Sequence, residues 1–278
     1  MNGKITILAE NYALHTPYAE DGICMLIAVD NKFYLFDTGF TGECALKNIE
    51  VMQIKIPQLA GIILSHGHND HTGGIASIIT RFGPCPIYAH PNIFNKTFSV
   101  RGKNKEYIGI PFERDYLEKK LKIPFHFSRD FTQIDKNIYM TGTIPMANKY
   151  EKIPRHFKIS NGSDNIDDFI EDTFEDDNAV VISDPKGLTV LLGCAHRGVI
   201  NSLEYVQQKL PHKKIHTVIG GTHLKEAGEE HFEFVVDYLK KLELDTFAPG
   251  HCTGINNIFK LQNIFGTCLH PAFCGEKF

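Results

Sequence analysis

The sequence predicts an α/β fold, and more specifically a four-layer αββα sandwich in which two sheets pack face to face between outer helices. Two observations predict it. Each half of the chain opens with antiparallel strand signals, and each half then continues with strand-length apolar runs that alternate with helical segments. Each half would therefore build one sheet with one face left to cover, and the two sheets cover those faces by packing together.

The first half begins with a strand over residues 4–10 and a hairpin whose strands, residues 22–30 and 32–39, flank the turn at Asp30 and Asn31. Apolar spacing then predicts alternating helices and strands. These elements are a helix over 42–54, a buried strand over 59–66, a helix over 73–83 and a strand over 85–91. The second half repeats this rhythm, with strands over 178–184, 187–196, 215–223 and 245–251 and helices over 198–210, 229–242 and 255–266.

The middle of the chain is less regular. Residues 92–136 are basic and rich in aromatic side chains, and they are partly helical around Glu113–Leu121. We expect this segment to be a lid-like insertion in a single domain that spans residues 1–278. A strand is expected over 137–145, and the polar, acidic stretch 149–177 is expected to be a long loop.

Composition argues against several classes of protein. The net charge of −4 gives no overall basic field, so we expect no nucleic-acid partner. The apolar runs are far shorter than the roughly 20 residues of a membrane helix, so we expect no membrane segment, and the first residues lack a signal-peptide pattern. The seven cysteines fit reduced thiols, which predicts a cytoplasmic protein. We expect its partner to be a small-molecule substrate. The sequence leaves open whether it is a monomer or a homo-oligomer.

Histidines gather where predicted strands end, which is where sites assemble in layered α/β folds. A single histidine at such a position is more often a structural hydrogen-bonding residue than a ligand. When several separate strands end this way, a metal site is indicated instead. Seven of the fourteen histidines stand at these positions: His66, His68, His71, His90, His196, His223 and His251.

The run GIILSHGHNDHTGG, residues 61–74, carries the densest set of ligand-type side chains. His66 and His68 are two apart on an extended loop and can face one ion, whereas Asp70 and His71 follow as the chain turns into a helix and can face a second ion. Imidazole with carboxylate suits zinc, with manganese or iron as alternatives. Two ions about 3.5–4 Å apart can share a bridging water and supply hydroxide at neutral pH.

This H-x-H-x-D-H run resembles the signature of the metallo-β-lactamase superfamily, and the resemblance covers nearly the whole chain. The segment FYLFDTG resembles an earlier motif of that family, which implies that Asp37 orients a ligand histidine. The segment FAPGHCTG resembles a late motif, which implies that His251 is a ligand of the second ion. With TGTIP, GLTVLLGCAHRGVIN and VIGGTHL, it resembles the branch of 7,8-dihydropterin-6-methyl-4-(β-D-ribofuranosyl)aminobenzene-5′-phosphate synthase-like hydrolases. The resemblance implies a metallo-β-lactamase-like fold and a metal-dependent hydrolase.

Two ligand positions depart from the usual pattern of the family. The place of a midway histidine reads Met140–Asn148 and contains none, so we infer that His196 completes the first site with His66 and His68. The usual bridging aspartate is also absent, and Cys194 stands near its place. Cys194 either approaches the bridging position or is a buried apolar thiol, and the second interpretation is favoured.

Several further residues have both a functional and a structural interpretation. His223 follows two glycines and is a candidate ligand, substrate contact or catalytic proton donor, unless it only bonds the backbone. Asp70 is a second catalytic candidate, through a water that it holds. His90 could line the cleft, and Asp176 and Asp177 are either cleft carboxylates or, as favoured, a solvated turn.

The basic insertion indicates a substrate class if it covers the site. Arg101, Lys103 and Lys105 could then meet a phosphate, although an ordinary solvated surface is the favoured interpretation. The expected activity is hydrolysis of a small phosphoester, ester or lactone, and a pterin phosphate would fit. The alternatives are a non-catalytic metal-binding protein and a di-iron redox protein on the same fold.

Overall fold

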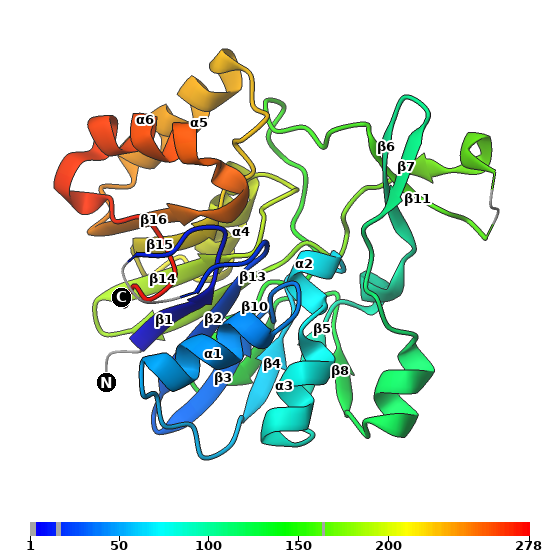
Figure 1. The fold of residues 1–278 in the computed structure, drawn as a ribbon. Coiled ribbons are helices and arrows are strands. Elements are labelled where there is room, and N and C mark those ends of the chain that lie inside the picture. Colours follow the sequence, from blue (N-terminus) through cyan, green and yellow to red (C-terminus); the bar gives the residue numbers. More distant parts are fainter. Residues whose placement is uncertain (1–3, 15–17, 163–164) are drawn as a thin grey trace.

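The computed structural model describes residues 4–14, 18–162 and 165–278 of the chain. Within these ranges the strands form two six-stranded sheets and one four-stranded sheet (Figure 1). None of the helices in these ranges is both long enough and apolar enough to span a lipid bilayer.

The first large sheet comes from the first half of the chain and has the strand order β1-β2-β3-β4-β5-β8. β1 pairs antiparallel with β2, and β2 pairs antiparallel with β3. Parallel pairing then adds β4, β5 and β8 in turn. The strands are β1 (Lys4–Ala9), β2 (Cys24–Val29), β3 (Lys32–Phe36), β4 (Gly61–Ile63), β5 (Ile87–Ala89) and β8 (Phe125–Phe127). The helices of this half are α1 (Glu43–Val51), the one-turn α2 (Asn69–Thr72) and α3 (Ile75–Phe82).

The second large sheet has the order β16-β15-β14-β13-β10-β9. Here β14, β15 and β16 are parallel, while β13, β10 and β9 continue the sheet antiparallel. The strands are β9 (Thr132–Asp135), β10 (Ile138–Met140), β13 (Ala179–Asp184), β14 (Gly187–Leu192), β15 (Ile215–Gly221) and β16 (Thr246–Gly250). Its helices are α4 (Val199–Lys209), α5 (Glu229–Lys241) and α6 (Ile255–Phe265).

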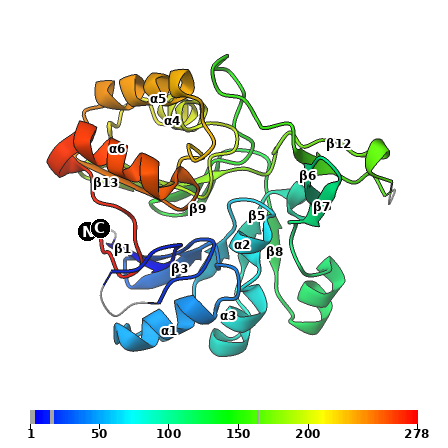
Figure 2. The same cartoon turned by 45° about the horizontal axis from the view of Figure 1, so that its top comes forward.

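The core follows the alternation of side chains along the strands, because successive residues point to opposite faces of a sheet. Leu35 and Ile62 pack with the apolar faces of α1 and α3, whereas their neighbours Phe36 and Ile63 pack against the other large sheet. A matching cluster fills the space between the second sheet and α4, α5 and α6. Figure 2 shows the resulting order of helices, sheet, sheet and helices. The predicted α/β class and its four-layer αββα arrangement are confirmed.

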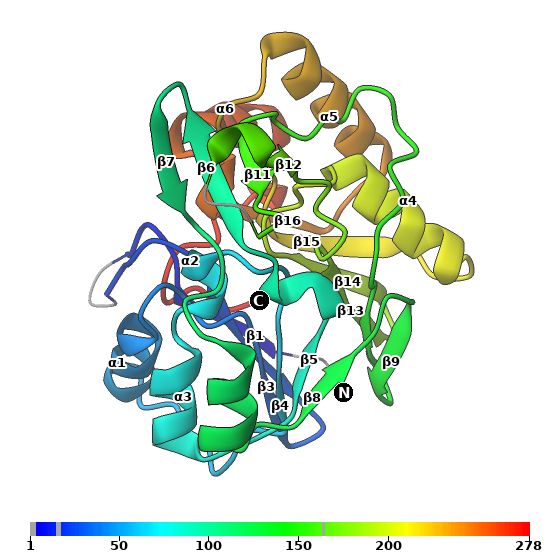
Figure 3. The same ribbon diagram turned by 90° about the vertical axis from the view of Figure 1, so that its right-hand side faces the viewer.

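The middle of the chain is divided among three sheets. Of the segment 92–136, β8 and β9 belong to the two large sheets, and a π-helical turn covers Tyr116–Lys120. The expectation of a long loop over 149–177 is wrong, because it contains two strands that pair with each other. One of them also pairs with a strand of the segment 92–136, and together they build a small sheet beside the sandwich (Figure 3). This small sheet contains β6 (Thr97–Arg101), β7 (Asn104–Tyr107), β11 (Phe157–Ile159) and β12 (Ile170–Glu171). The local sequence carried no signal for strands whose partner lies about 60 residues away.

Candidate metal centre

The loop rich in metal-ligand side chains follows β4 and runs into α2, and a buried carboxylate at the end of β3 holds it. Oδ1 of Asp37 accepts a hydrogen bond from the Ser65 backbone N–H (2.7 Å), and its Oδ2 accepts one from Ser65 Oγ (2.7 Å). Nδ1 of His71 donates to the same Oδ2 (2.7 Å), which is the contact that the family resemblance implies. Ser65 Oγ also accepts from Nδ1 of His66 (2.9 Å). When Nδ1 carries the only ring proton, Nε2 of His66 and of His71 keeps a lone pair. Burial opposes protonation of His71, but the carboxylates of Asp70 and Asp37 raise its pKa, so an ion at its Nε2 would take the place of a proton.

The first donor group consists of His66, His68 and His196, whose ligand nitrogens lie within 4.8 Å of one another. Nε2 of His66 and Nε2 of His196 are 3.2 Å apart, and Nε2 of His68 is buried without a hydrogen-bond partner in the described part of the chain. Burial lowers the pKa of His68 to about 3 and also lowers the pKa of His66 and His196. Converging neutral imidazoles with no proton to share fit a transition-metal ion.

The second donor group consists of Asp70, His71 and His251, again within 4.8 Å. Nε2 of His251 lies 3.3 Å from Nε2 of His71 and 3.2 Å from Oδ2 of Asp70, while its Nδ1 donates to Oδ1 of Asn11 (2.7 Å). Burial alone would raise the pKa of Asp70, but the neighbouring histidines lower it well below its usual range. Burial opposes protonation of His251, yet the hydrogen bond to Asp70 raises the pKa of His251 to about 9. Without a metal, the ring of His251 therefore carries a proton that faces Asp70, where a metal cation would bind.

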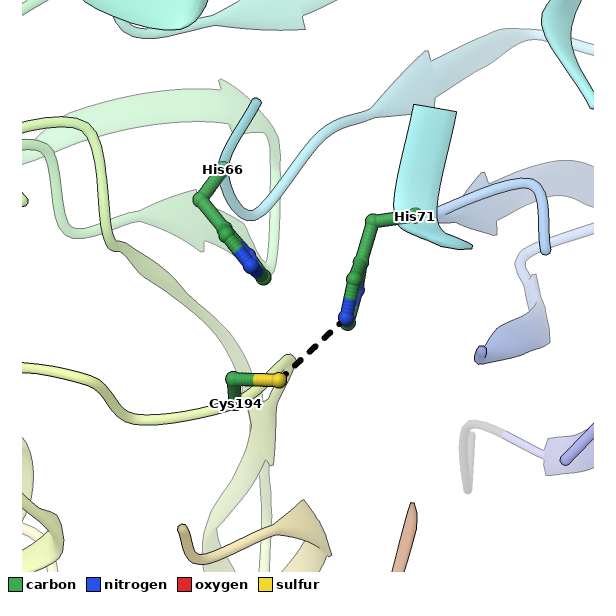
Figure 4. A group of neighbouring side chains, drawn as sticks. All are labelled: His66, His71 and Cys194. Atoms are coloured by element: carbon green, nitrogen blue, oxygen red, sulfur yellow. Dashed lines mark hydrogen bonds between the residues drawn. The ribbon is translucent and has the colours of Figure 1, made fainter. Parts of the chain in front are cut away.

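Cys194 lies where the two donor groups meet. Its Sγ is 3.3 Å from Nε2 of His71, and it falls within 4.8 Å of the ligand nitrogens of His66 and His71 (Figure 4). In Figure 4 the two imidazoles and the thiol point toward one another, with His66 on the loop after β4, His71 on α2 and the cysteine after β14. The thiol is buried, as the favoured interpretation expects. Ligand-type nitrogens of His66 and His71 lie beside it, so its role as a ligand stays a prediction.

Asp176 and Asp177 also differ from the favoured interpretation, since both are buried and neither lies in a solvated turn. Oδ2 of Asp176 accepts from the Gly67 backbone N–H (2.8 Å), and Oδ2 of Asp177 accepts from the Arg197 backbone N–H (2.9 Å). Burial raises the pKa of Asp176 to about 8 and that of Asp177 to about 6. The pair therefore holds the two backbone segments that carry the first donor group.

His223 lies next to the first donor group. Among the described residues it is not part of any group that could hold an ion. Its ring centroid is 4.4 Å from that of His196, and both residues line a cavity of about 580 Å³. Burial lowers the pKa of His223 to about 4, so its ring is neutral. His90 lies apart from the groups: its Nδ1 accepts from the Asn92 backbone N–H (3.1 Å), and its Nε2 is 3.0 Å from Thr143 Oγ1.

The basic side chains predicted to meet a phosphate lie on the small sheet, and none of them lines this cavity in the described structure. Arg101 at the end of β6 donates to Oε1 of Glu226 (2.7 Å) and lies 3.0 Å from Nε2 of His156. Lys103 is exposed in the turn between β6 and β7. Lys105 places its ammonium 5.0 Å from the ring centroid of Phe98.

Sequence reasoning missed three residues of the site. Ser65 links Asp37 to His66, Asn11 orients His251, and Cys252 lies within 4.8 Å of Cys194 and His251. Ser65 and Cys252 each stand next to a predicted ligand in the sequence, and this adjacency could have marked them as candidate site residues. Asn11 is 240 residues from His251, and no local pattern could have pointed to it.

A four-layer αββα sandwich with histidine and aspartate groups at its strand ends is the architecture of the metallo-β-lactamase superfamily, and the chain belongs to that superfamily. The family's sequence profile matches residues 19–156. The chain is 34% identical to the 7,8-dihydropterin-6-methyl-4-(β-D-ribofuranosyl)-aminobenzene-5′-phosphate synthase of Methanocaldococcus jannaschii, over 95% of this chain and 90% of that protein.

Two further comparisons agree with this assignment. An uncharacterised protein of the same organism is 31% identical, and the match covers 94% of each chain. Among solved structures, a metal-dependent hydrolase of the β-lactamase superfamily superposes with a TM-score of 0.83 at 25% identity, covering 100% of this chain and 98% of that one. The likeness to relatives thus extends over almost the whole chain, which agrees with the extent of the resemblance in the sequence.

Proposed function

We propose that this protein is a metal-dependent hydrolase that binds one or two ions and acts on a small phosphoester, ester or lactone. Zinc is the first candidate for the ion, and manganese and iron are alternatives. The observation that supports the proposal is the convergence of the two donor groups, each with three ligand-type side chains, beside a cavity. In the first group, Nε2 of His68 is buried and has no hydrogen-bond partner among the residues that the structure describes, so a bound ion would explain its burial.

The residues would divide the work as follows. His66, His68 and His196 would hold one ion, and Asp70, His71 and His251 the other. Bound ions of this kind act as Lewis acids and lower the pKa of a water molecule. Asp37 and Asn11 keep the ring planes and tautomers of His71 and His251.

The leaving group needs a proton, and His223 is our candidate for delivering it. Its ring is neutral, so it would relay the proton, with one ring nitrogen accepting from a water while the other donates to the leaving group. His223 lines the cavity at the side of the first donor group, in ring contact with His196. Asp70 is the second catalytic candidate, because its Oδ2 faces His251 and can also hold a water. His90 and the basic residues of the small sheet keep their predicted role as substrate contacts only if the substrate extends beyond the cavity.

The cavity supports a small metabolite as substrate. Its volume of about 580 Å³ lies within the range of sites for small molecules. Lys149 and Lys152 line it and would suit a phosphate, and Tyr150 offers an aromatic face. The name of the M. jannaschii relative specifies a dihydropterin and a phosphate, so we propose a pterin phosphate as the first substrate to try.

A second candidate function is bond formation instead of hydrolysis, because that relative is named a synthase. The same donor groups and the same cavity could serve either reaction. The two candidates differ in their products, since hydrolysis consumes water and releases two fragments, whereas synthesis joins two substrates.

The test combines metal analysis with a substrate panel. Purified protein is assayed for bound zinc, manganese and iron, and then tested with phosphodiesters, phosphomonoesters, lactones and a pterin phosphate. We expect bound metal, and hydrolysis that His68→Ala abolishes while His126→Ala, a change at an exposed histidine of β8, leaves it intact. Activity that persists in His68→Ala would contradict the proposal, and condensation without hydrolysis would favour the synthase.

A further inference from the structure

A third set of ligand-type side chains adjoins the second donor group. Cys194, His251 and Cys252, which we call the sulfur group, have ligand atoms within 4.8 Å of one another. Both thiols are free. Cys194 follows β14, and Cys252 lies in the single 3₁₀ turn His251–Thr253 that follows β16. The set therefore joins the ends of β14 and β16, the two strands that flank β15 in the second sheet.

The backbone around the sulfur group leaves room for the thiol of Cys252. At Gly221, the last residue of β15, a Cβ atom would lie 2.6 Å from Sγ of Cys252 and 3.2 Å from Cα of Cys194. Only glycine leaves this space open. The backbone N–H of His223 donates to Sγ of Cys252 (3.2 Å), and amide donors of this kind stabilise a sulfur that carries negative charge.

Three residues other than glycine around the sulfur group have a positive φ. They are Ala195, which follows Cys194, His251, which precedes Cys252, and His223, which donates to Cys252, with φ values of 54°, 49° and 52°. Such conformations cost on the order of 1–3 kcal/mol each and gather at functional sites. Their clustering beside two thiols supports a function for the sulfurs.

We propose that Cys252 is a metal-binding residue and that the sulfur group takes a thiophilic cation such as Zn²⁺ in preference to Mn²⁺. Two thiolates and one imidazole form a soft donor set with a fourth position left open. Nδ1 of His251 is bonded to Asn11, so its Nε2 is the nitrogen that remains for an ion.

The sulfur group and the second donor group compete for this nitrogen. An ion at His251 is held together with Asp70 and His71, or together with Cys194 and Cys252. The softness of the ion decides between them, since carboxylate oxygen suits hard ions and thiolate suits soft ones. This inference rests on the proposed metal binding and adds a selection among metals that an imidazole and carboxylate shell does not provide.

The first test uses absorption of the cobalt-loaded full-length protein, because thiolate bound to Co²⁺ gives a near-ultraviolet charge-transfer band that imidazole and carboxylate lack. We expect the band in the wild type, a loss of about half its intensity in Cys252→Ser, and an unchanged band in Cys268→Ser. Cys268 is a matched control, a partly exposed thiol whose Sγ donates to the Phe265 carbonyl oxygen (3.2 Å). We also expect at least a tenfold loss of Cd²⁺ affinity in Cys252→Ser, with Mn²⁺ affinity unchanged. An equal band in the wild type and Cys252→Ser overturns the proposal.

The second test needs no variant. X-ray absorption at the zinc edge of wild-type protein with one equivalent of zinc counts the sulfur atoms at about 2.3 Å. Two sulfurs support the proposal. One sulfur, or none, overturns the role of Cys252 while the proposed hydrolase stands. Failure to bind zinc or cobalt at all overturns both.

Discussion

The two halves of the chain contribute to the metal centre in different ways. The first half supplies its donors from one short segment after β4, the loop with His66 and His68 and the following α2 with Asp70 and His71. The second half supplies its donors singly, His196 after β14 and His251 after β16, from different strand ends. Spacing within the chain sets the positions of the first set, whereas the packing of strands sets the positions of the second.

The supports of the two sets differ accordingly. Asp37 holds the segment of the first half through short hydrogen bonds to Ser65 and His71, all within the first half of the chain, and Asp176 adds one bond from the second half at Gly67. In the second half, His251 depends on a side chain from a distant segment, whereas the support of His196 lies nearby in the chain. Asp177 holds the backbone at Arg197, and Asn11 orients His251. We therefore expect a substitution at Asp37 to disturb donors that lie nearby in the chain. A substitution at Asn11 should disturb a donor far away in the chain, through a tertiary contact.

The largest effects should come from the donors themselves. His66→Ala and His251→Ala should each lower the metal-to-protein ratio, and should reduce kcat/KM by more than the roughly 100-fold that loss of a supporting residue causes. His66→Ala should empty the first donor group alone, and His251→Ala the second. Elemental analysis and steady-state kinetics measure both, with exposed His270→Ala as a control. Wild-type metal content in both variants would refute the assignment of the two groups.

The supports should rank next. Asp37→Asn should weaken metal affinity by roughly 10–100-fold, because it removes the acceptor that orients His71 and the loop. Asn11→Ala should lie near the lower end of that range, since Asn11 orients His251 alone. Competition with a chelator measures both affinities. Equal losses in the two variants would show that the halves do not differ as we infer.

The third effect is a pH dependence that belongs to the second half. Glu151 is buried, and its carboxylate accepts from the backbone N–H groups of Ile200 (2.8 Å) and Asn201 (2.7 Å) at the start of α4. Burial raises the pKa of Glu151 from 4.5 to about 7. A raised pKa in the folded state contributes stability below pH 4.5 that is lost as the pH rises through about 7.

Wild type should therefore lose about 3 kcal/mol of unfolding free energy relative to Glu151→Gln between pH 4.5 and pH 8. Denaturation in urea across this range measures the difference. The glutamine variant keeps one amide oxygen as an acceptor, so it serves as the matched reference. Parallel stability profiles for the two proteins would argue against this role of Glu151.

The smallest effect should come from the ion pair that joins the halves at the surface. The side chains of Arg101 and Glu226 are 56% and 48% exposed, so Arg101→Ala should change the unfolding free energy by less than about 1 kcal/mol. Lys32→Ala, which breaks the pair with Asp135, is the matched comparison. If KM for a phosphorylated substrate rises in Arg101→Ala while stability holds, Arg101 also contacts substrate as the sequence analysis predicted.

The sequence by itself determined the layers and the loop donors of this protein. Alternating apolar runs indicate strands and helices directly, and His66, His68, Asp70 and His71 lie so close in the chain that local geometry brings them together. The tertiary structure alone decided that Cys194 and Cys252 meet, that Asp176 and Asp177 are buried supports, and that β11 pairs with β6. These contacts join segments tens to hundreds of residues apart, and sequence spacing contains no information on which strand ends become neighbours when two sheets pack.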